Sequence, residues 1–322
     1  MGRGGSRAPA LVAIGNFDGV HRGHVEVLTR AGREAVANSA IPLALTFDPP
    51  PAVVLGRKTP ASLTPLERKI ELIEAAVPGM RVVVKTFDQA LADSSPEQFA
   101  REVLVGELAA ARVVVGENFR FGKGRSGDLS TLVGLSNELG FSARAMEIVG
   151  DDKGPWSSTR VRRSIAAGDW DDVRTVLGRP HALSGVVRRG DQRGRTIGFP
   201  TANLHEVAEV LPPNGVYAVL VDRLDRAEGP RALAKGVANV GMRPTVGGGF
   251  STEVHLLDFV ASEADRDLYG ARLRIHLEAF LRGERKFENL DALKEQIEKD
   301  AEKARTLLAP TKPTPGPFGG WY

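Results

Sequence analysis

Hydrophobic positions in the first half of the chain follow two alternating patterns. Short runs rich in β-branched residues are separated by longer stretches with apolar residues at helical spacing, as in a parallel sheet covered by helices. The predicted strands span residues 11–14, 41–47, 81–84, 112–115 and 143–148, and the predicted helices span residues 24–37, 66–76, 96–108 and 129–138. We therefore expect an α/β domain with a doubly wound parallel sheet over residues 1–179.

The pattern changes after residue 180. Four apolar runs, at residues 215–221, 236–240, 253–259 and 272–280, follow one another with turn-rich connections and no helix between them. This predicts antiparallel strands that form a small β-barrel. Apolar residues at helical spacing over residues 290–308 predict one helix that closes the domain at about residue 309. Residues 310–322 hold four prolines and three glycines, which predicts a flexible tail.

Composition narrows the possible classes of function. Apolar residues make up 42% of the chain and charged residues 26%, which argues against global disorder and fibrous architectures. Cysteine is absent, so the chain has no disulfide, thiolate metal site or cysteine nucleophile. With 43 basic and 40 acidic residues the net charge is only +3, which disfavours a polycationic nucleic-acid binder. The sequence shows neither a signal peptide nor a membrane span, and we expect a cytoplasmic protein.

The first candidate site follows the first predicted strand. A glycine-rich turn there runs into a helix start, where backbone N–H groups and the helix dipole favour a phosphate. His21 and His24 are three residues apart and can point to one side, where their imidazoles can stabilise charge on a triphosphate. The alternative is that both histidines are capping or packing residues. The other candidate nucleotide-binding residues of this turn are Gly15, Asn16, Phe17, Asp18, Gly19 and Gly23.

Two further segments are candidates for the same site. Asn118 lies in a Phe- and Gly-rich loop after the fourth strand, at the same edge of the sheet, and can bind a base, ribose or phosphate. Ser158 and Thr159 open a later helix that also carries Arg162, whose guanidinium can neutralise a leaving pyrophosphate. A surface loop and an ordinary capped helix are the respective alternatives.

The second candidate site belongs to the β-rich half. Residues 185–204 contain several glycines and arginines, Arg195 among them, and suit an anion-binding flap. Thr201 and Asn203 alternate in an extended segment, so both side chains can offer oxygen ligands to Mg²⁺ and phosphate from one side. Glu253 lies in a predicted strand and can accept the proton of an attacking hydroxyl. Without Glu253, an exposed basic hairpin would be the better explanation of the flap.

These motifs resemble the bacterial bifunctional riboflavin kinase/FAD synthetase family over nearly the whole chain. The Gly15–His24 segment, Asn118 and the Ser-Ser-Thr-x-x-Arg stretch ending at Arg162 match its adenylyltransferase module. The Gly198, Phe199, Pro200, Thr201, Ala202 and Asn203 run is similar to its riboflavin kinase signature. The loop from Leu281 to Phe287, with Arg282 and Phe287, resembles the part that helps enclose the flavin, although an ordinary charged turn is the alternative. One departure is Pro50, where the family often has His.

The resemblance implies a Rossmann-like nucleotidyltransferase domain that adenylylates FMN to FAD over residues 1–179, and a riboflavin kinase domain over residues 180–309. It further implies Mg²⁺-ATP as co-substrate, riboflavin and FMN as ligands, Thr201 and Asn203 as Mg-ATP ligands and Glu253 as the base. The competing hypothesis is a flavin- or nucleotide-responsive RNA-binding protein that uses the arginines of the flap. Whether protomers form a homo-oligomer is left open.

Overall fold

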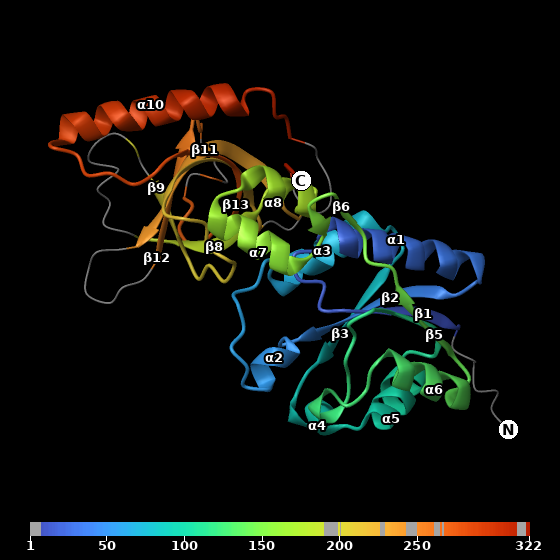
Figure 1. Cartoon of the computed structure of the whole chain (residues 1–322). Coiled ribbons are helices and arrows are strands. Elements are labelled where there is room, and N and C mark those ends of the chain that lie inside the picture. The colour runs from blue at the N-terminus through green and yellow to red at the C-terminus, as the bar shows by residue number, and fades with distance from the viewer. Residues whose placement is uncertain are drawn as a thin grey trace. The chain divides into compact units, whose positions relative to one another are not determined.

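Five parallel strands form the sheet of the first half of the chain (Figure 1). Their order is β3-β2-β1-β4-β5, with bounds β1(Ala10–Ile14), β2(Ile41–Asp48), β3(Arg81–Thr86), β4(Ala110–Gly116) and β5(Ser142–Met146). All five residues of β1 are buried because the strand lies at the centre and both of its faces are covered. The doubly wound parallel sheet is confirmed, and the strand order reverses between β1 and β4. This computed structural model describes residues 8–189, 199, 201–225, 229–242, 250–260, 265, 267–313 and 320–322.

Helices cover both faces of this sheet. One buried cluster joins the sheet to α1(Arg22–Ala37) and α3(Leu66–Ala76). The other joins it to η1(Phe99–Glu107), a π-helix, and α6(Leu129–Leu139). Ser95 and Gln98 form a capping box at the start of α5(Pro96–Gln98), which runs into η1. The remaining short elements are α2(Pro51–Val54), α4(Gln89–Asp93), η2(Lys123–Arg125), β6(Gly150–Asp151) and β7(Gly154–Pro155).

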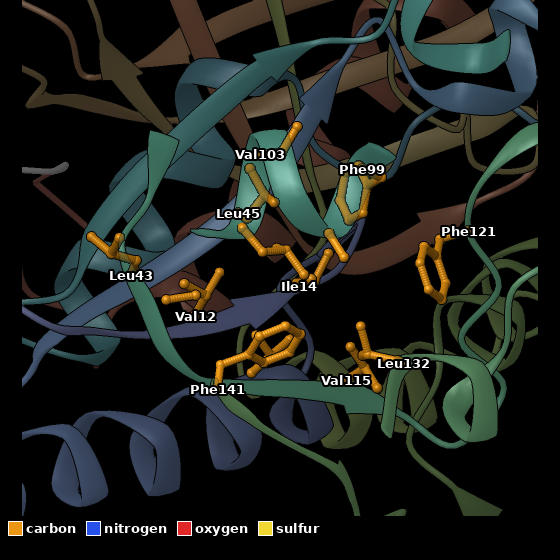
Figure 2. Close-up of a cluster of buried hydrophobic side chains, with 14 of the residues drawn as sticks. Val12, Ile14, Leu43, Leu45, Phe99, Val103, Val115, Phe121, Leu132 and Phe141 are labelled. Atoms are coloured by element: carbon orange, nitrogen blue, oxygen red, sulfur yellow. The ribbon is translucent and has the colours of Figure 1, made fainter. Parts of the chain in front are cut away.

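The cluster under η1 and α6 supports the carboxyl edge of the central strands. Figure 2 shows Val12 and Ile14 of β1 beside Leu45 of β2, with side chains of η1 and α6 around them. Phe121, which follows β4, belongs to the same cluster. The loops after β1 and β4 are therefore held on one packed core, and they can keep a fixed distance from each other.

The second half of the chain forms a closed barrel. Its strand order is β10-β11-β12-β9-β8-β13, with bounds β8(Ala182–Arg188), β9(Thr201–His205), β10(Gly215–Arg223), β11(Arg231–Met242), β12(Phe250–Leu257) and β13(Arg272–Arg282). The final helix, α10(Leu290–Leu308), has the predicted bounds and packs its apolar stripe, including Ala301, Ala304 and Leu308, on the outside of the barrel. The predicted antiparallel barrel with a C-terminal helix is confirmed. In the described part of the chain, no helix has the length and apolar content of a membrane span.

Residue contacts divide the chain into two units. Unit 1 comprises Met1–Pro60 and Thr64–Ser158, and unit 2 comprises Ala61–Leu63 and Thr159–Tyr322. The helices α7(Ser158–Ala167) and α8(Trp170–Leu177) connect the sheet to the barrel in sequence. Trp170 of α8 packs against the interior cluster of the barrel, which is why this helix groups with unit 2. The contact boundary therefore lies at the start of α7, whereas the predicted functional boundary at residue 180 lies after α8.

The last three residues of the chain contact the barrel unit. Trp321 is buried, and its indole N–H donates to the Val221 carbonyl at 3.0 Å. The Tyr322 hydroxyl donates to Glu278 at 2.8 Å, and burial together with this bond raises the pKa of Tyr322 to about 12. A Pro- and Gly-rich composition predicts weak local structure, but it carries no information about one aromatic anchor at the far end.

We expect Trp321→Ala to destabilise unit 2 by about 3 to 5 kcal/mol, because a buried aromatic side chain is replaced by a cavity. Tyr322→Phe, which loses one hydroxyl and keeps the ring, is the matched control and should cost about 1 kcal/mol. Differential scanning calorimetry of both variants measures the difference. Equal melting temperatures for Trp321→Ala and the unmodified protein would show that the anchor does not contribute to stability.

Candidate active sites

The loop between β1 and α1 has an unusual backbone. Phe17 and Val20 have φ values of 46° and 38°, and both side chains are buried. Non-glycine residues in this region cost about 1 to 3 kcal/mol each and persist where the surroundings fix them. Gly19 has a φ of 84°, which a residue with a Cβ rarely adopts. Such strain is concentrated at functional sites, and here it lies in the predicted phosphate-binding turn.

His21 and His24 lie together at the start of α1. His21 is the N-cap, and its Nδ1 accepts a hydrogen bond from the His24 backbone N–H at 3.3 Å. Because Nδ1 accepts, the ring proton of neutral His21 is on Nε2. The two rings stack with centroids 3.6 Å apart, so the predicted common orientation is confirmed. The edge of the Phe17 ring meets His24 at 5.4 Å. His21 is therefore both a cap and a candidate donor.

Gly23 suits this arrangement because its neighbours leave little space for a side chain. A Cβ at this position would lie 3.0 Å from the Trp156 carbonyl oxygen and 3.1 Å from Nδ1 of His21. The indole of Trp156 also supports Arg22, whose guanidinium lies 4.4 Å from the ring centroid. A side chain at position 23 would require Trp156 or the ring of His21 to shift by a few tenths of an ångström.

Two residues outside the turn hold its backbone, and only one of them was predicted from the sequence. The Gly19 N–H donates to the Thr64 hydroxyl at 3.1 Å, and the Thr64 N–H donates to Asp18 at 3.4 Å. The Ser158 hydroxyl donates to the Asp18 carbonyl at 2.8 Å. Ser158 was a predicted site residue, whereas Thr64 was not. Nothing in the local sequence relates Thr64 to a turn 45 residues away.

Behind the turn lies a buried lysine. Lys69 of α3 donates to the Thr46 hydroxyl at 3.5 Å, and that hydroxyl donates to the Asn16 carbonyl at 3.3 Å. Burial lowers the pKa of Lys69, while the carboxylates of Asp18 and Asp48 oppose this effect. The sequence offers no sign of this arrangement, because Lys69 occupies an ordinary polar position in an amphipathic helix.

A cavity of about 320 Å³ opens beside the turn, at the carboxyl edge of β1 and β4. Gly15, Asn16 and Asn118 all line it, so the structure brings together the two loops that sequence analysis assigned to one site. Five phenylalanines contribute an apolar wall: Phe47, Phe87, Phe99, Phe119 and Phe121. Three arginines supply positive charge: Arg57, Arg120 and Arg125. An apolar cavity with a few polar and cationic groups is typical of a site for a flat, anionic ligand.

The aromatic wall is built by ring contacts. Phe119 and Phe121 stack at 5.3 Å, Phe121 meets Phe99 at 5.7 Å, and Phe47 meets the edge of Phe87 at 5.7 Å. Pro50, where the family often has His, is the residue before α2. Pro51 and Ala52 of α2 line the cavity. Pro50 itself offers no hydrogen-bond donor.

The two arginines of α7 serve different purposes. Arg160 is buried and donates to both carboxylate oxygens of Asp172, at 3.1 and 2.6 Å, which links α7 to α8. Arg162 is accessible to solvent, and its guanidinium donates to the Ala61 carbonyl at 2.9 Å. Thr159 and Arg162 belong to unit 2, whereas Ser158 is the last residue of unit 1. Of the two arginines, Arg162 is the one that can exchange a backbone partner for a phosphate.

On the barrel, strand register brings the candidate kinase residues together. Asn203 of β9 is paired with Glu253 of β12, and Thr201 is paired with His255. Ala202 and Val254 point into the barrel core, so these four residues share the outer face. Asn203 is buried, and the Ser251 hydroxyl donates to Glu253 at 3.2 Å. The Thr201 hydroxyl, the Asn203 amide and the Glu253 carboxylate therefore lie on the same face of this pair of strands.

Phe199 lies next to this group, with its ring in an edge contact with His255 at 5.3 Å. The other predicted residues of the run, Arg195, Gly198 and Pro200, lie outside the described residues. His255 was not predicted as a site residue. The alternation along β12 that places Glu253 on the outer face also places His255 there, so this pattern was the available signal.

The candidate flavin loop after β13 is organised by α10. Arg282 donates to Asp300 from Nε and Nη2, with the shorter distance 2.8 Å, and its guanidinium lies 5.6 Å from the Phe287 ring centroid. Arg285 lies 4.9 Å from the same ring and is hydrogen-bonded to Gln296. Two guanidinium groups therefore lie near the Phe287 ring. Arg282 has a structural partner, and its predicted flavin contact remains a prediction.

Comparisons with known proteins find a separate family match for each half of the chain. A family model described as FAD synthetase matches residues 5–160, and one described as riboflavin kinase matches residues 177–308. The chain is 39% identical over 314 residues to the bifunctional riboflavin kinase/FMN adenylyltransferase of Escherichia coli strain K12, covering 96% of each protein. The chain belongs to the bifunctional riboflavin kinase/FMN adenylyltransferase family. The predicted resemblance is confirmed.

Other members of the riboflavin kinase/FMN adenylyltransferase family match over similar lengths. The Bacillus subtilis strain 168 protein is 37% identical over 309 residues and 92% of each chain. A crystal structure described as a macrolide-efflux protein from Streptococcus pneumoniae covers 94% of this chain and 95% of its own, with a TM-score of 0.78 and 27% identity. The fold is therefore found beyond the proteins that carry the family name.

Proposed function

We propose that the chain converts riboflavin to FMN on the barrel and FMN to FAD on the parallel sheet, using ATP in both reactions. The kinase activity is assigned to residues 180–309 and the adenylyltransferase activity to residues 1–179. One observation supports this proposal most strongly. The motifs of the sheet domain and those of the barrel are matched by two different family models, and most of them lie in two different units of the chain. The product of the first reaction is the substrate of the second.

In the adenylyltransferase reaction, a phosphate oxygen of FMN attacks the α-phosphorus of ATP and pyrophosphate leaves. The aromatic cavity beside Gly15 and Asn118 suits the flavin ring. Its volume of about 320 Å³ and its wall of phenylalanines match a flat apolar group. His21 and His24 donate to the oxygens that gain charge, and the N-terminus of α1 adds its dipole. The assignment of Arg162 to the leaving pyrophosphate stays a prediction from the sequence. These roles need positioning and charge, not a covalent intermediate.

In the kinase reaction, the 5′-hydroxyl of riboflavin attacks the γ-phosphorus of ATP and ADP leaves. Glu253 accepts the hydroxyl proton, and Thr201 and Asn203 bind the phosphates. The oxygens of these side chains are the hard donors that Mg²⁺ takes, so the residues present fit the ion. When bound, Mg²⁺ neutralises phosphate charge. Thr201 and Asn203 would hold it on the outer face of β9.

The RNA-binding alternative has no support in the described part of the flap. Arg188 is paired with Glu206, and Arg189 lies 5.3 Å from the Tyr269 ring centroid. Both cations therefore already have partners within the barrel unit. Arg193 and Arg195 lie outside the described residues.

The proposed chemistry predicts which phosphorus atoms are transferred. With riboflavin and Mg-ATP labelled at the α-phosphate, label should enter FAD and never FMN, because the kinase transfers only the γ-phosphoryl group. FMN should also precede FAD in time. Chromatography that resolves riboflavin, FMN and FAD measures both. Labelled FMN, or salt-sensitive RNA binding without turnover, would contradict the proposal.

A further inference from the structure

The cation of Lys69 is buried behind the Gly15–His24 turn. Its side chain comes from α3, and the residue is 6% exposed. Its amino group reaches the Thr46 hydroxyl at 3.5 Å, and Thr46, which is fully buried, donates onward to the Asn16 carbonyl at 3.3 Å. A hydrogen-bonded chain therefore connects α3, β2 and the first residues of the turn. Asn16 lines the cavity, so this chain ends at the proposed substrate site.

The charges around Lys69 give it a second effect. Its electrostatic partners are the carboxylates of Asp18 in the turn and Asp48 at the end of β2. The ammonium of Lys69 therefore offsets negative charge in and beside the turn that receives the polyphosphate in the proposed function, and like charges repel strongly where water is partly excluded. A buried ammonium is costly, which is consistent with the lowered pKa of this group. A site needed only to fill space would be served equally by Met.

We propose that Lys69 is a positioning residue of the adenylyltransferase site. It fixes the Asn16 carbonyl through Thr46 and offsets the charge of Asp18, so that the turn is preorganised for the polyphosphate of ATP. The inference rests on the proposed function of the sheet domain. It assigns no contact between Lys69 and the reacting atoms.

Three substitutions test this role. Lys69→Met keeps the length and removes the charge, Lys69→Arg keeps the charge, and Thr46→Val keeps the volume and breaks the hydrogen-bonded chain. We expect Lys69→Met to lower kcat/KM for FMN adenylylation by about 10- to 100-fold, mainly through a higher KM for ATP, because misplacement of a binding loop has effects of this size. Lys69→Arg should recover part of the loss, and Thr46→Val should lose less than Lys69→Met. Lys85→Met is the matched control, since Lys85 is paired with Glu107 and makes none of these contacts.

The readouts separate positioning from folding. Each full-length variant is assayed with FMN and Mg-ATP, then with riboflavin and Mg-ATP, and its thermal unfolding is recorded. We expect unchanged kinase rates and no lower melting temperature for Lys69→Met. Adenylylation equal to the unmodified protein, or a loss that only follows a lower melting temperature, would overturn the proposal. If Lys69→Met fails to fold, full adenylylation by Thr46→Val overturns it and a raised KM for ATP supports it. An unmodified protein that makes no FAD would instead overturn the proposed function.

Discussion

A Glu253→Gln variant is expected to phosphorylate riboflavin about 10² to 10⁴ times more slowly than the unmodified protein, because removal of a general base has effects of this size. The amide keeps the shape of the carboxylate and can still contact Ser251, whose hydroxyl now donates to Glu253. It cannot accept the proton of the riboflavin 5′-hydroxyl. The strand register keeps Asn203 and Asn239 on either side of position 253, so local structure should hold.

The same preparation supplies its own control. FMN given directly should still become FAD, since Glu253 belongs to the barrel unit and the proposed adenylyltransferase turn belongs to the other. Glu298→Gln, an exposed carboxylate on α10, controls for the loss of one negative charge. Normal riboflavin phosphorylation by Glu253→Gln would remove this residue from the mechanism. A parallel loss of both activities would indicate a folding defect.

Periodicity predicted the architecture because burial dictates it. Every residue of β1 is buried, and the continuous apolar run of residues 11–14 already indicated a central strand. The bounds of α3 and α10 match the predicted ranges, since each helix has a clear apolar stripe. The predicted start of α1 was two residues late because His21, as its N-cap, begins the helix at Arg22. Caps are set by side-chain hydrogen bonds, which periodicity does not detect.

The candidate sites were only partly predictable. Motifs next to strand ends identified Asn16, Asn118 and His24, because sheet topology gathers such ends at one edge. The supporting residues Thr64 and Lys69 were not predicted. Thr64 contacts the turn across 45 residues of sequence, and Lys69 reaches it through Thr46, which is 23 residues from Lys69. A buried lysine in a helix has the same local pattern as an exposed one. Its role depends on what lies opposite, which only the folded structure shows.

A His24→Ala variant is expected to adenylylate FMN about 10² to 10³ times more slowly, as for the loss of one preorganised donor to a developing negative charge. The barrel contains none of the atoms changed, so riboflavin should still be converted to FMN and accumulate there. Separate assays with riboflavin and with FMN measure the two steps. Loss of both activities would argue for a single shared centre and against two sites.

His24→Phe distinguishes catalysis from packing at this position. The His24 ring stacks on His21 at 3.6 Å and meets Phe17, so a packing role alone is a real alternative. Phenylalanine can keep both ring contacts but has no N–H to donate. If His24 stabilises the transition state, His24→Phe should lose as much adenylylation as His24→Ala, while His24→Asn, which keeps an N–H donor, should retain more. Near-normal FAD synthesis by His24→Phe would assign the residue to packing, and His21 would then be the remaining candidate donor on this helix.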